Sequence, residues 1–271
     1  MKVTQRIIFA VSVTVLLSFG GCKKDGGLNF FTIEDDKKFG AQMEVEIASK
    51  PAEYPILSQS QYPAAYAYLE SLKQAILDGG QLQHKNDFAW KLYIIEDDAT
   101  QNAFCTPGGY IYVYTGLIKT LDNASSLAGV MGHEMAHADR RHSTQQLTAQ
   151  YGFSLMVSVI AGTTGQDEIA QIVGSLSSLA YSRDHEKDAD AHSVIYLCPT
   201  QYRADGAADF FEKIGSQGVP AFLSSHPDPG ARVTNIRAKK AELETSTGCN
   251  GNIGGASDAS SYTSFKAMLP N

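Results

Sequence analysis

Two histidines and a glutamate share one short stretch of this chain, His133-Glu134-Met135-Ala136-His137. Apolar residues at helical spacing in residues 127–142 predict a helix, on which positions four apart lie one above the other. Both imidazoles can therefore reach one metal ion from the same face. Glu134 lies about 100° further round, which suits a carboxylate that takes a proton from a water on the metal. A helix whose buried polar residues merely satisfy one another is the weaker interpretation, because such groups are costly to bury without an ion.

A third ligand must come from elsewhere, because catalytic zinc takes three protein ligands and leaves one position for water. The leading candidates are Glu186 and Asp190, four residues apart on another predicted helix. One carboxylate can bind the ion while the other accepts the N–H of a ligating histidine and sets its tautomer. From the residues alone, the same acidic stretch also fits a solvated helix start, and His185 and His192 compete as ligands.

The elements that must position these residues follow from periodicity and turn signals. Helices are expected at 32–49, 63–77, 127–142, 153–161 and 169–180, and strands at 88–95 and 110–114. Ser125 or Ser126 is the expected N-cap of the central helix. The apolar stretches at 153–161 and 169–180 fall short of the ~20 residues of a membrane span, so packed helices are expected there. The predicted fold class is α+β, mainly helical with a small sheet.

Four different motifs follow one another along the chain. Asn102-Ala-Phe-x-x-Pro-Gly-Gly-Tyr-Ile-Tyr-Val-Tyr-Thr-Gly-Leu precedes the histidine pair, and Ser182-Arg183-x-x-Glu186-x-x-x-Asp190 and Ser225-His226-Pro-Asp-Pro-x-x-Arg232 follow it. This order resembles the HtpX and CAAX prenyl endopeptidase family, metallopeptidase family 48, of the gluzincin kind. The resemblance covers residues 35–245 and is closest to the exported bacterial branch without transmembrane spans.

The resemblance implies a zincin-like metallopeptidase domain with an edge strand near the active-site cleft. It implies one zinc ion per chain, held by His133, His137 and Glu186. It also implies Glu134 as the general base and Asp190 as the partner of a ligating histidine. His185 and His192 are then left with surface or packing roles, and His142 with hydrogen bonding at the helix end.

His226 is expected on a loop, just before a helix opened by Asp228 and Pro229. As a catalytic residue it would stabilise the tetrahedral oxyanion. Alternatively, it would occupy the open position of zinc and keep the enzyme silent until the loop moves, and a histidine with neither role is the third interpretation. Arg232 is expected to pair with a carboxylate in the region of Glu186 and Asp190.

The first 22 residues resemble an export signal that ends in a bacterial lipobox. Lys2 and Arg6 precede an apolar run, and Cys22 follows Gly20-Gly21. The resemblance implies cleavage before Cys22 and lipidation of that residue; a plain secretory peptide is the alternative. Removing residues 1–21 takes Lys2 and Arg6 from the 22 basic residues and leaves all 29 acidic ones, so the formal charge changes from −7 to −9. This charge argues against nucleic acid as a partner.

The expected organisation is a signal peptide at 1–21, a lipidated tether at 22–31, one zinc metallopeptidase domain at 32–245 and a flexible tail at 246–271. The tail is rich in Ser, Thr and Gly, which predicts poor order. Cys198 and Cys249 flank the C-terminal part and are predicted to form a disulfide. Cys105 is expected to be a buried small residue.

The sequence thus predicts a zinc-dependent endopeptidase of the bacterial cell envelope, in the periplasm and lipid-anchored to a membrane, with the outer membrane favoured. Misfolded or unassembled envelope proteins are the substrates that the resemblance implies, and they would lie extended against the strand at 110–114. The alternative is a periplasmic chaperone or assembly factor with a latent or structural zinc site. The presence of Glu134 argues against it, because a structural site needs no base.

Overall fold

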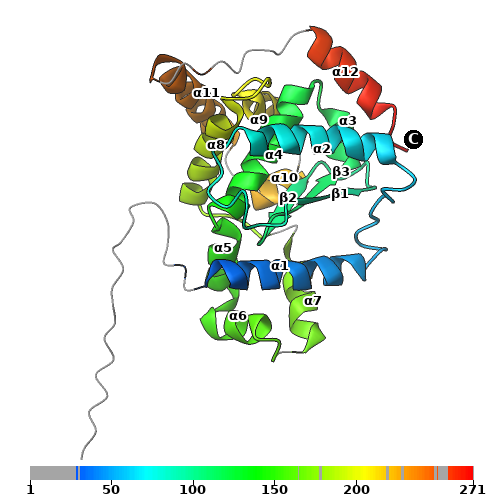
Figure 1. Cartoon of the computed structure of the whole chain (residues 1–271), viewed down its shortest axis with the longest axis vertical. Helices are drawn as coiled ribbons and strands as arrows, with labels where there is room; N and C mark the ends of the chain where they lie inside the picture. Colours follow the sequence, from blue (N-terminus) through cyan, green and yellow to red (C-terminus); the bar gives the residue numbers. More distant parts are fainter. Residues whose placement is uncertain are drawn as a thin grey trace, which may run out of the picture.

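The computed structural model describes residues 29, 31–163, 165–176, 179–217, 220–226, 229–246, 249 and 256–270. The predicted signal peptide at 1–21, the lipidation site Cys22 and the predicted helix cap Asp228 lie outside these residues. In chain order the elements are α1 (Ile33–Ala48), α2 (Pro63–Asp78), β1 (Lys91–Ile95), β2 (Ala103–Thr106), β3 (Tyr110–Tyr114), α3 (Thr115–Thr120), α4 (Ala124–Asp139), α5 (His142–Tyr151), α6 (Phe153–Ile160), α7 (Gln166–Gly174), α8 (Arg183–Leu197), α9 (Gly206–Gln217), α10 (Pro220–Ser225), α11 (Pro229–Ser246) and α12 (Ala256–Lys266). The fold is α+β and mainly helical, as predicted (Figure 1).

The described sheet has the strand order β1-β3-β2, with β1 parallel and β2 antiparallel to β3. Because β3 is paired on both sides, the expectation that a substrate lies against residues 110–114 is wrong. Of the described strands, β1 and β2 form the edges, and β2 packs on α4. The strand expected at 88–95 starts only at Lys91, because Trp90 adopts a positive φ of 43°.

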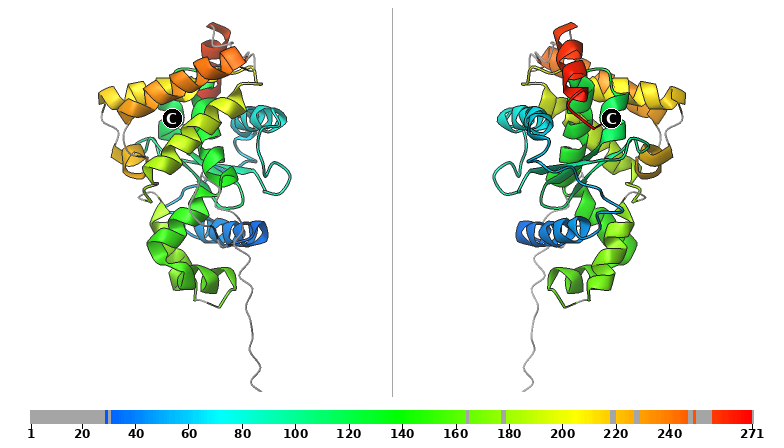
Figure 2. Two further views of the ribbon diagram at one scale, coloured as in Figure 1. Left: turned by 90° about the vertical axis from the view of Figure 1, so that its left-hand side faces the viewer. Right: turned by 90° about the vertical axis from the view of Figure 1, so that its right-hand side faces the viewer.

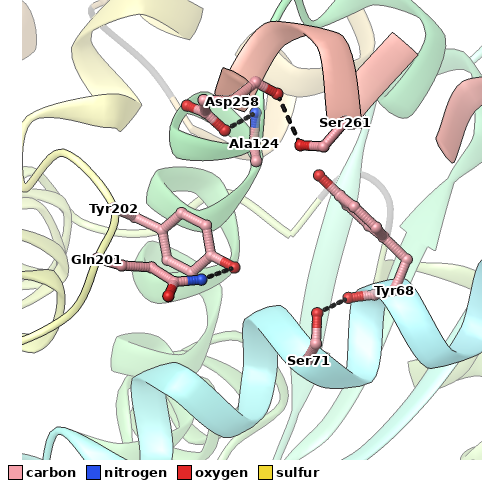
Figure 3. A pocket seen from close by; sticks show the side chains of 7 residues that line it. All are labelled: Tyr68, Ser71, Ala124, Gln201, Tyr202, Asp258 and Ser261. Atoms are coloured by element: carbon pink, nitrogen blue, oxygen red, sulfur yellow. Dashed lines mark hydrogen bonds between the residues drawn. The ribbon is translucent and has the colours of Figure 1, made fainter. Parts of the chain in front are cut away.

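Helix α4 runs through the middle of the protein with all of its residues buried, and α8 and α9 pack along it. Its N-cap is Asn123 rather than Ser125 or Ser126, because the Asn123 side chain accepts the backbone N–H of Ser126. The N–H groups of Ala124 and Ser125 donate to the carboxylate of Asp258 in α12, at 3.0 and 3.3 Å, and Figure 3 draws the first of these bonds. A cavity of about 390 Å³ lies at this end of α4, lined by Tyr68, Ser71, Ala124, Gln201, Tyr202, Asp258 and Ser261 (Figure 3).

Helices α6 and α7 lie beside α1 at one end of the molecule (Figures 1 and 2). Side chains of α1 and of the turn after it bind their backbones: Gln42 Nε2 donates to Val159 O, and Lys50 Nζ to Ala170 O. Both apolar stretches contain packed helices, as predicted, but the helix expected at 169–180 ends at Gly174. In the part of the chain that the structure describes, none of the helices combines the length and the hydropathy that crossing a membrane requires.

Helix α12 packs against α2 and α4, so the expectation of a flexible tail at 246–271 is wrong for residues 256–270. Tyr262 and Phe265 are fully buried, and the Tyr262 hydroxyl donates to Ile118 O at 2.7 Å. The two aromatic residues are three apart and fall on one helical face, a signal that the polar composition of the segment hides.

The disulfide predicted between Cys198 and Cys249 is confirmed. It ties the end of α8 to the chain between α11 and α12. Cys105 is free and buried, also as predicted.

Candidate metal centre

His133 and His137 lie one turn apart in α4 and are fully buried. Their Nε2 atoms are 3.0 Å apart, so both rings direct the same nitrogen to one point. Gly129, one turn earlier, lets α9 approach, because a Cβ there would collide with the backbone of Gly206 and Ala207. The helix and the facing histidines agree with the prediction from their spacing.

Helix α8 brings Glu186 and Asp190 to the same place. Ser182 caps the start of the helix by accepting the N–H of His185. The Glu186 carboxylate faces both Nε2 atoms: Oε2 lies 3.5 Å from that of His133, and Oε1 lies 3.4 Å from that of His137. Asp190 stands behind His133, with Oδ1 3.0 Å from Nδ1. The two carboxylates thus occupy the two different places that the sequence suggested for them.

His226 follows α10 directly, and its ring is 1% exposed. The backbone N–H of His226 donates to Phe222 O at 2.8 Å, and the rings of His226 and Phe222 stack with centroids 4.3 Å apart. Nδ1 lies 2.9 Å from Glu186 Oε1 and 3.3 Å from His133 Nε2. Nε2 lies 3.4 Å from Glu134 Oε1. The ring is therefore part of the buried group around the two histidines of α4.

One ligand atom from each of His133, His137, Glu186 and His226 can be chosen so that all four lie within 4.8 Å of one another. Imidazole nitrogens and a carboxylate oxygen are donors that zinc takes in proteins. Glu134 is a second indication of a metal site. It is fully buried, and neither of its oxygens accepts a hydrogen bond from a described residue. Buried carboxylates are ordinarily hydrogen-bonded, so this arrangement fits a site that takes a metal ion and a water.

Arg232 of α11 closes the back of the site and is 3% exposed. Its Nε and Nη2 donate to the two oxygens of Asp190, at 2.9 and 2.6 Å. Its Nη1 lies 2.7 Å from Glu186 Oε2, and the guanidinium lies 3.8 Å from the centre of the Phe211 ring. The predicted pairing of Arg232 with a carboxylate is confirmed. The two parallel hydrogen bonds from its guanidinium hold the Asp190 carboxylate against His133.

Burial is the main cause of the pKa shifts of His133, His137 and Glu134. It lowers the pKa of His133 to about 4, helped by the charge of Arg232, and it lowers the pKa of His137 well below the usual value. Burial raises the pKa of Glu134 to about 7, against the opposing effect of His226. Burial also pushes the pKa of Glu186 upward, but the charges of His226 and Arg232 outweigh burial and hold it well below the usual value. Neutral imidazoles and an ionised carboxylate are the forms that bind metals.

Two histidines that competed as ligands lie elsewhere. His185 Nε2 is 3.0 Å from Gln145 Oε1, and His192 Nδ1 is 2.8 Å from Asp188 O. Neither belongs to the buried group of ligand atoms.

Two neighbours of His137 were missed as parts of the site. The Tyr181 ring stacks on the His137 ring with centroids 3.8 Å apart. The backbone N–H of Tyr181 donates to the backbone oxygen of Ser225, the residue before His226. Tyr181 directly precedes the Ser182-Arg183 motif, and that position was its signal in the sequence. His142 Nδ1 lies 3.2 Å from His137 Nδ1, on the side away from Glu186.

Comparison with known proteins agrees with this geometry. The profile of peptidase family M48 matches residues 63–240. The chain is 30% identical over 164 residues to mitochondrial metalloendopeptidase OMA1 of Arabidopsis thaliana, covering 59% of this chain and 33% of the relative. It is 30% identical over 159 residues to a putative beta-barrel assembly-enhancing protease of Vibrio cholerae, covering 52% and 33%. It is 28% identical over 157 residues to metalloprotease YcaL of Escherichia coli, covering 55% and 60%.

The match to the first two relatives spans about a third of their length, and the match to the third spans 60%. The family profile, in contrast, covers more than half of the 271 residues and includes every proposed ligand. The chain therefore belongs to peptidase family M48, a family of zinc metalloproteases.

Proposed function

We propose that this chain is a zinc-dependent endopeptidase that hydrolyses misfolded or unassembled proteins of the bacterial cell envelope. The observation that supports this activity most strongly is the buried set of nitrogen and oxygen donors beside Glu134. The oxygens of Glu134 have no hydrogen-bond partner among the described residues. A purely structural zinc site has no use for such a carboxylate. The alternative of a chaperone or assembly factor with a structural site is therefore not favoured.

His133, His137 and Glu186 would hold the ion. A bound zinc ion supplies Lewis acidity, which lowers the pKa of an attacking water and polarises the scissile carbonyl. Asp190 accepts the Nδ1–H of His133, which leaves the lone pair of Nε2 for the metal. Glu134 accepts a proton from the attacking water at a carboxylate oxygen and passes it to the leaving amine.

His226 is proposed to block the site in the form described here. Its Nδ1 lies among the ligand atoms, close to Glu186 and His133. This position favours occupation of the open zinc position over stabilisation of an oxyanion. The His226 ring would then have to leave this position before a water and a substrate can enter.

The substrate is proposed to add as a strand to β2. The hydrogen bond from Tyr114 N–H to Asn102 O sets the antiparallel pairing, so that Ala103 and Cys105 turn their backbone groups away from β3. Cys105 O accepts the hydroxyl of Ser143 at 3.1 Å, and a substrate N–H would replace that donor. Main-chain hydrogen bonds recognise an extended segment with little demand on its sequence, which suits unfolded substrates.

The cellular location is proposed from the sequence and the relatives. Cys22 after Gly20-Gly21 supports lipidation and anchoring, with the outer membrane as the favoured membrane. A relative in Vibrio cholerae is named a putative beta-barrel assembly-enhancing protease, which supports envelope proteins as substrates. We therefore place the domain in the periplasm, with polypeptides and a membrane as partners and no nucleic acid.

The experiment compares the parent with Glu134→Gln and, as a matched control, Glu212→Gln. Glutamine keeps the shape of the side chain but is not a base, so E134Q should retain zinc and cleave unfolded casein about 10²–10⁴-fold more slowly. Glu212 pairs with Arg237 at the surface, so E212Q should cleave as the parent does. Cleavage by E134Q at the rate of the parent would rule out the mechanism.

A further inference from the structure

The two histidines of α4 differ in what stands behind them. Nδ1 of His133 lies 3.0 Å from the Asp190 carboxylate. Behind His137 the corresponding partner is another imidazole, that of His142, with the two Nδ1 atoms 3.2 Å apart. His142 in turn places Nε2 3.1 Å from Oδ2 of Asp188. A row of His137, His142 and Asp188 thus leads from the metal site toward the surface of α8.

A break between α4 and α5 makes this row possible. In an uninterrupted helix, residues five apart point about 140° apart, so the rings of residues 137 and 142 would not meet. Here α4 ends at Asp139, Arg141 takes a left-handed φ of 64°, and α5 begins at His142. Non-glycine residues seldom adopt this left-handed conformation, which costs free energy that the surrounding structure must offset.

Helix α1 enforces the break. Arg141 Nε donates to Asp36 Oδ2 at 2.6 Å, and Thr144 Oγ1 donates to Asp36 Oδ1 at 2.7 Å. Arg141 Nη2 also donates to Phe31 O at 2.6 Å. Asp36 is buried, so one carboxylate joins the residues on both sides of His142 to a helix about a hundred positions earlier. Backbone conformations of this kind cluster at functional sites, and here the break places His142 beside His137.

The protons along the row have one consistent arrangement when His137 uses Nε2 for a metal. The His137 proton is then on Nδ1 and is donated to Nδ1 of His142. The His142 proton is on Nε2 and is donated to Asp188, which also accepts Nε–H of Arg140 at 2.8 Å. Each member of the row is thus a donor to the next, with a carboxylate at the end.

We propose that His142 and Asp188 are positioning residues for His137, which set the tautomer and the ring orientation of this zinc ligand. The proposal rests on the proposed zinc-binding function. It assigns to His142 the task that Asp190 performs for His133, although the two partners differ in chemistry. Partners that hold a ligating histidine in this way tune metal affinity without touching the ion.

The test measures the zinc dissociation constant of the full chain by competition with a chelator. Loss of such a partner weakens metal binding about 10–100-fold, so His142→Ala should bind zinc more weakly by that factor. H142N should recover part of the loss, because its side-chain oxygen stands near the position of Nδ1 and can accept the His137 N–H. The matched control is H192N: His192 contacts Asp188 but not His137, so its zinc affinity should equal that of the parent.

Two further readouts separate positioning from packing. The visible spectrum of the cobalt(II)-substituted protein should change in H142A and stay unchanged in H192N, while the unfolding midpoint of the metal-free protein should be similar in both. Parent-like zinc affinity and spectrum in H142A would overturn the proposal. So would equal losses of zinc affinity in H142A and H192N, or a loss in H142A that follows instability of the metal-free protein.

An H142A variant that does not fold and a parent that binds no zinc have different consequences. If H142A does not fold, Asp188→Asn keeps the imidazole and removes only the charge at the end of the row; it should still weaken zinc binding, and parent-like affinity would refute the proposal. A parent protein that binds no zinc would overturn the proposed function and this proposal together. A parent that binds zinc, with H142A unchanged, would overturn this proposal alone.

Discussion

The His226 ring touches the groups that are proposed to do the chemistry. Nδ1 contacts Glu186 at 2.9 Å and His133 at 3.3 Å, and Nε2 lies 3.4 Å from Glu134 Oε1. A ring in this position competes with an attacking water for the space between the ligands and the base. His226 therefore decides whether this form of the protein can act on a substrate.

Replacing His226 by alanine is expected to raise the rate of casein cleavage by about tenfold or more, because activity scales with the fraction of molecules in the competent form. The measurement is the initial rate for H226A beside the parent. H84A serves as the histidine control, since the His84 ring pairs with Asp87 away from the site. A rate that falls about 10²–10³-fold in H226A would instead assign the ring to the oxyanion.

The sequence predicted the residues whose positions follow from one helix or one family motif. His133 and His137 face one point because four residues make about one helical turn, and the Ser182-Arg183 motif located Glu186 and Asp190. The contact of His142 with His137 could not be predicted, because helical spacing excludes it until Arg141 breaks the helix. Tyr181 was missed for a similar reason: its place beside His137 depends on the turn that precedes α8.

At the scale of elements, α4 depends at both ends on segments far away in the sequence. Its first N–H groups bind Asp258 of α12, and the turn after it is held by Asp36 of α1. The helix that carries two of the three proposed ligands is therefore fixed by the first and the last of the described helices.

Asp258→Ala should lower the free energy of unfolding by about 2 kcal/mol. The substitution removes a buried carboxylate from the N-terminal end of α4 and leaves the N–H groups of Ala124 and Ser125 without this acceptor. Denaturant unfolding of the full chain measures the change. S260A on an exposed position of the same helix is the control and should unfold like the parent. An equal stability of D258A and the parent would show that the contact contributes nothing to stability.

Element types were easier to predict than the arrangement of elements. Periodicity and the motifs located α4, α8 and the strand at 110–114, but α5, α9 and α10 were not predicted, and periodicity says nothing of strand order. The short β2 pairs with β3 on the side opposite β1, and this placement makes β3 central. Helix α12 was missed because its buried aromatic residues stand among serines and threonines, whose composition favours disorder.

At the scale of the whole molecule, charged groups gather in the interior of an acidic protein. Glu134, Glu186 and Asp190 are buried there with Arg232 as the one guanidinium among them. Buried charges are tolerated when they are paired. Arg232 pairs with Glu186 and Asp190, and burial raises the pKa of Glu134 to about 7, so that this third carboxyl is only partly ionised near neutral pH. A divalent cation would balance the negative charge that remains, which agrees with the metal site.

The most direct measurement is the zinc content of the purified protein beside His137→Ala, with cleavage of unfolded casein followed in parallel. We expect one zinc per chain in the parent, and we expect H137A to lose both the zinc and the cleavage, because one of three ligands is gone. A parent without zinc, or an H137A variant that keeps zinc and still cleaves casein, would contradict the proposed site and its chemistry.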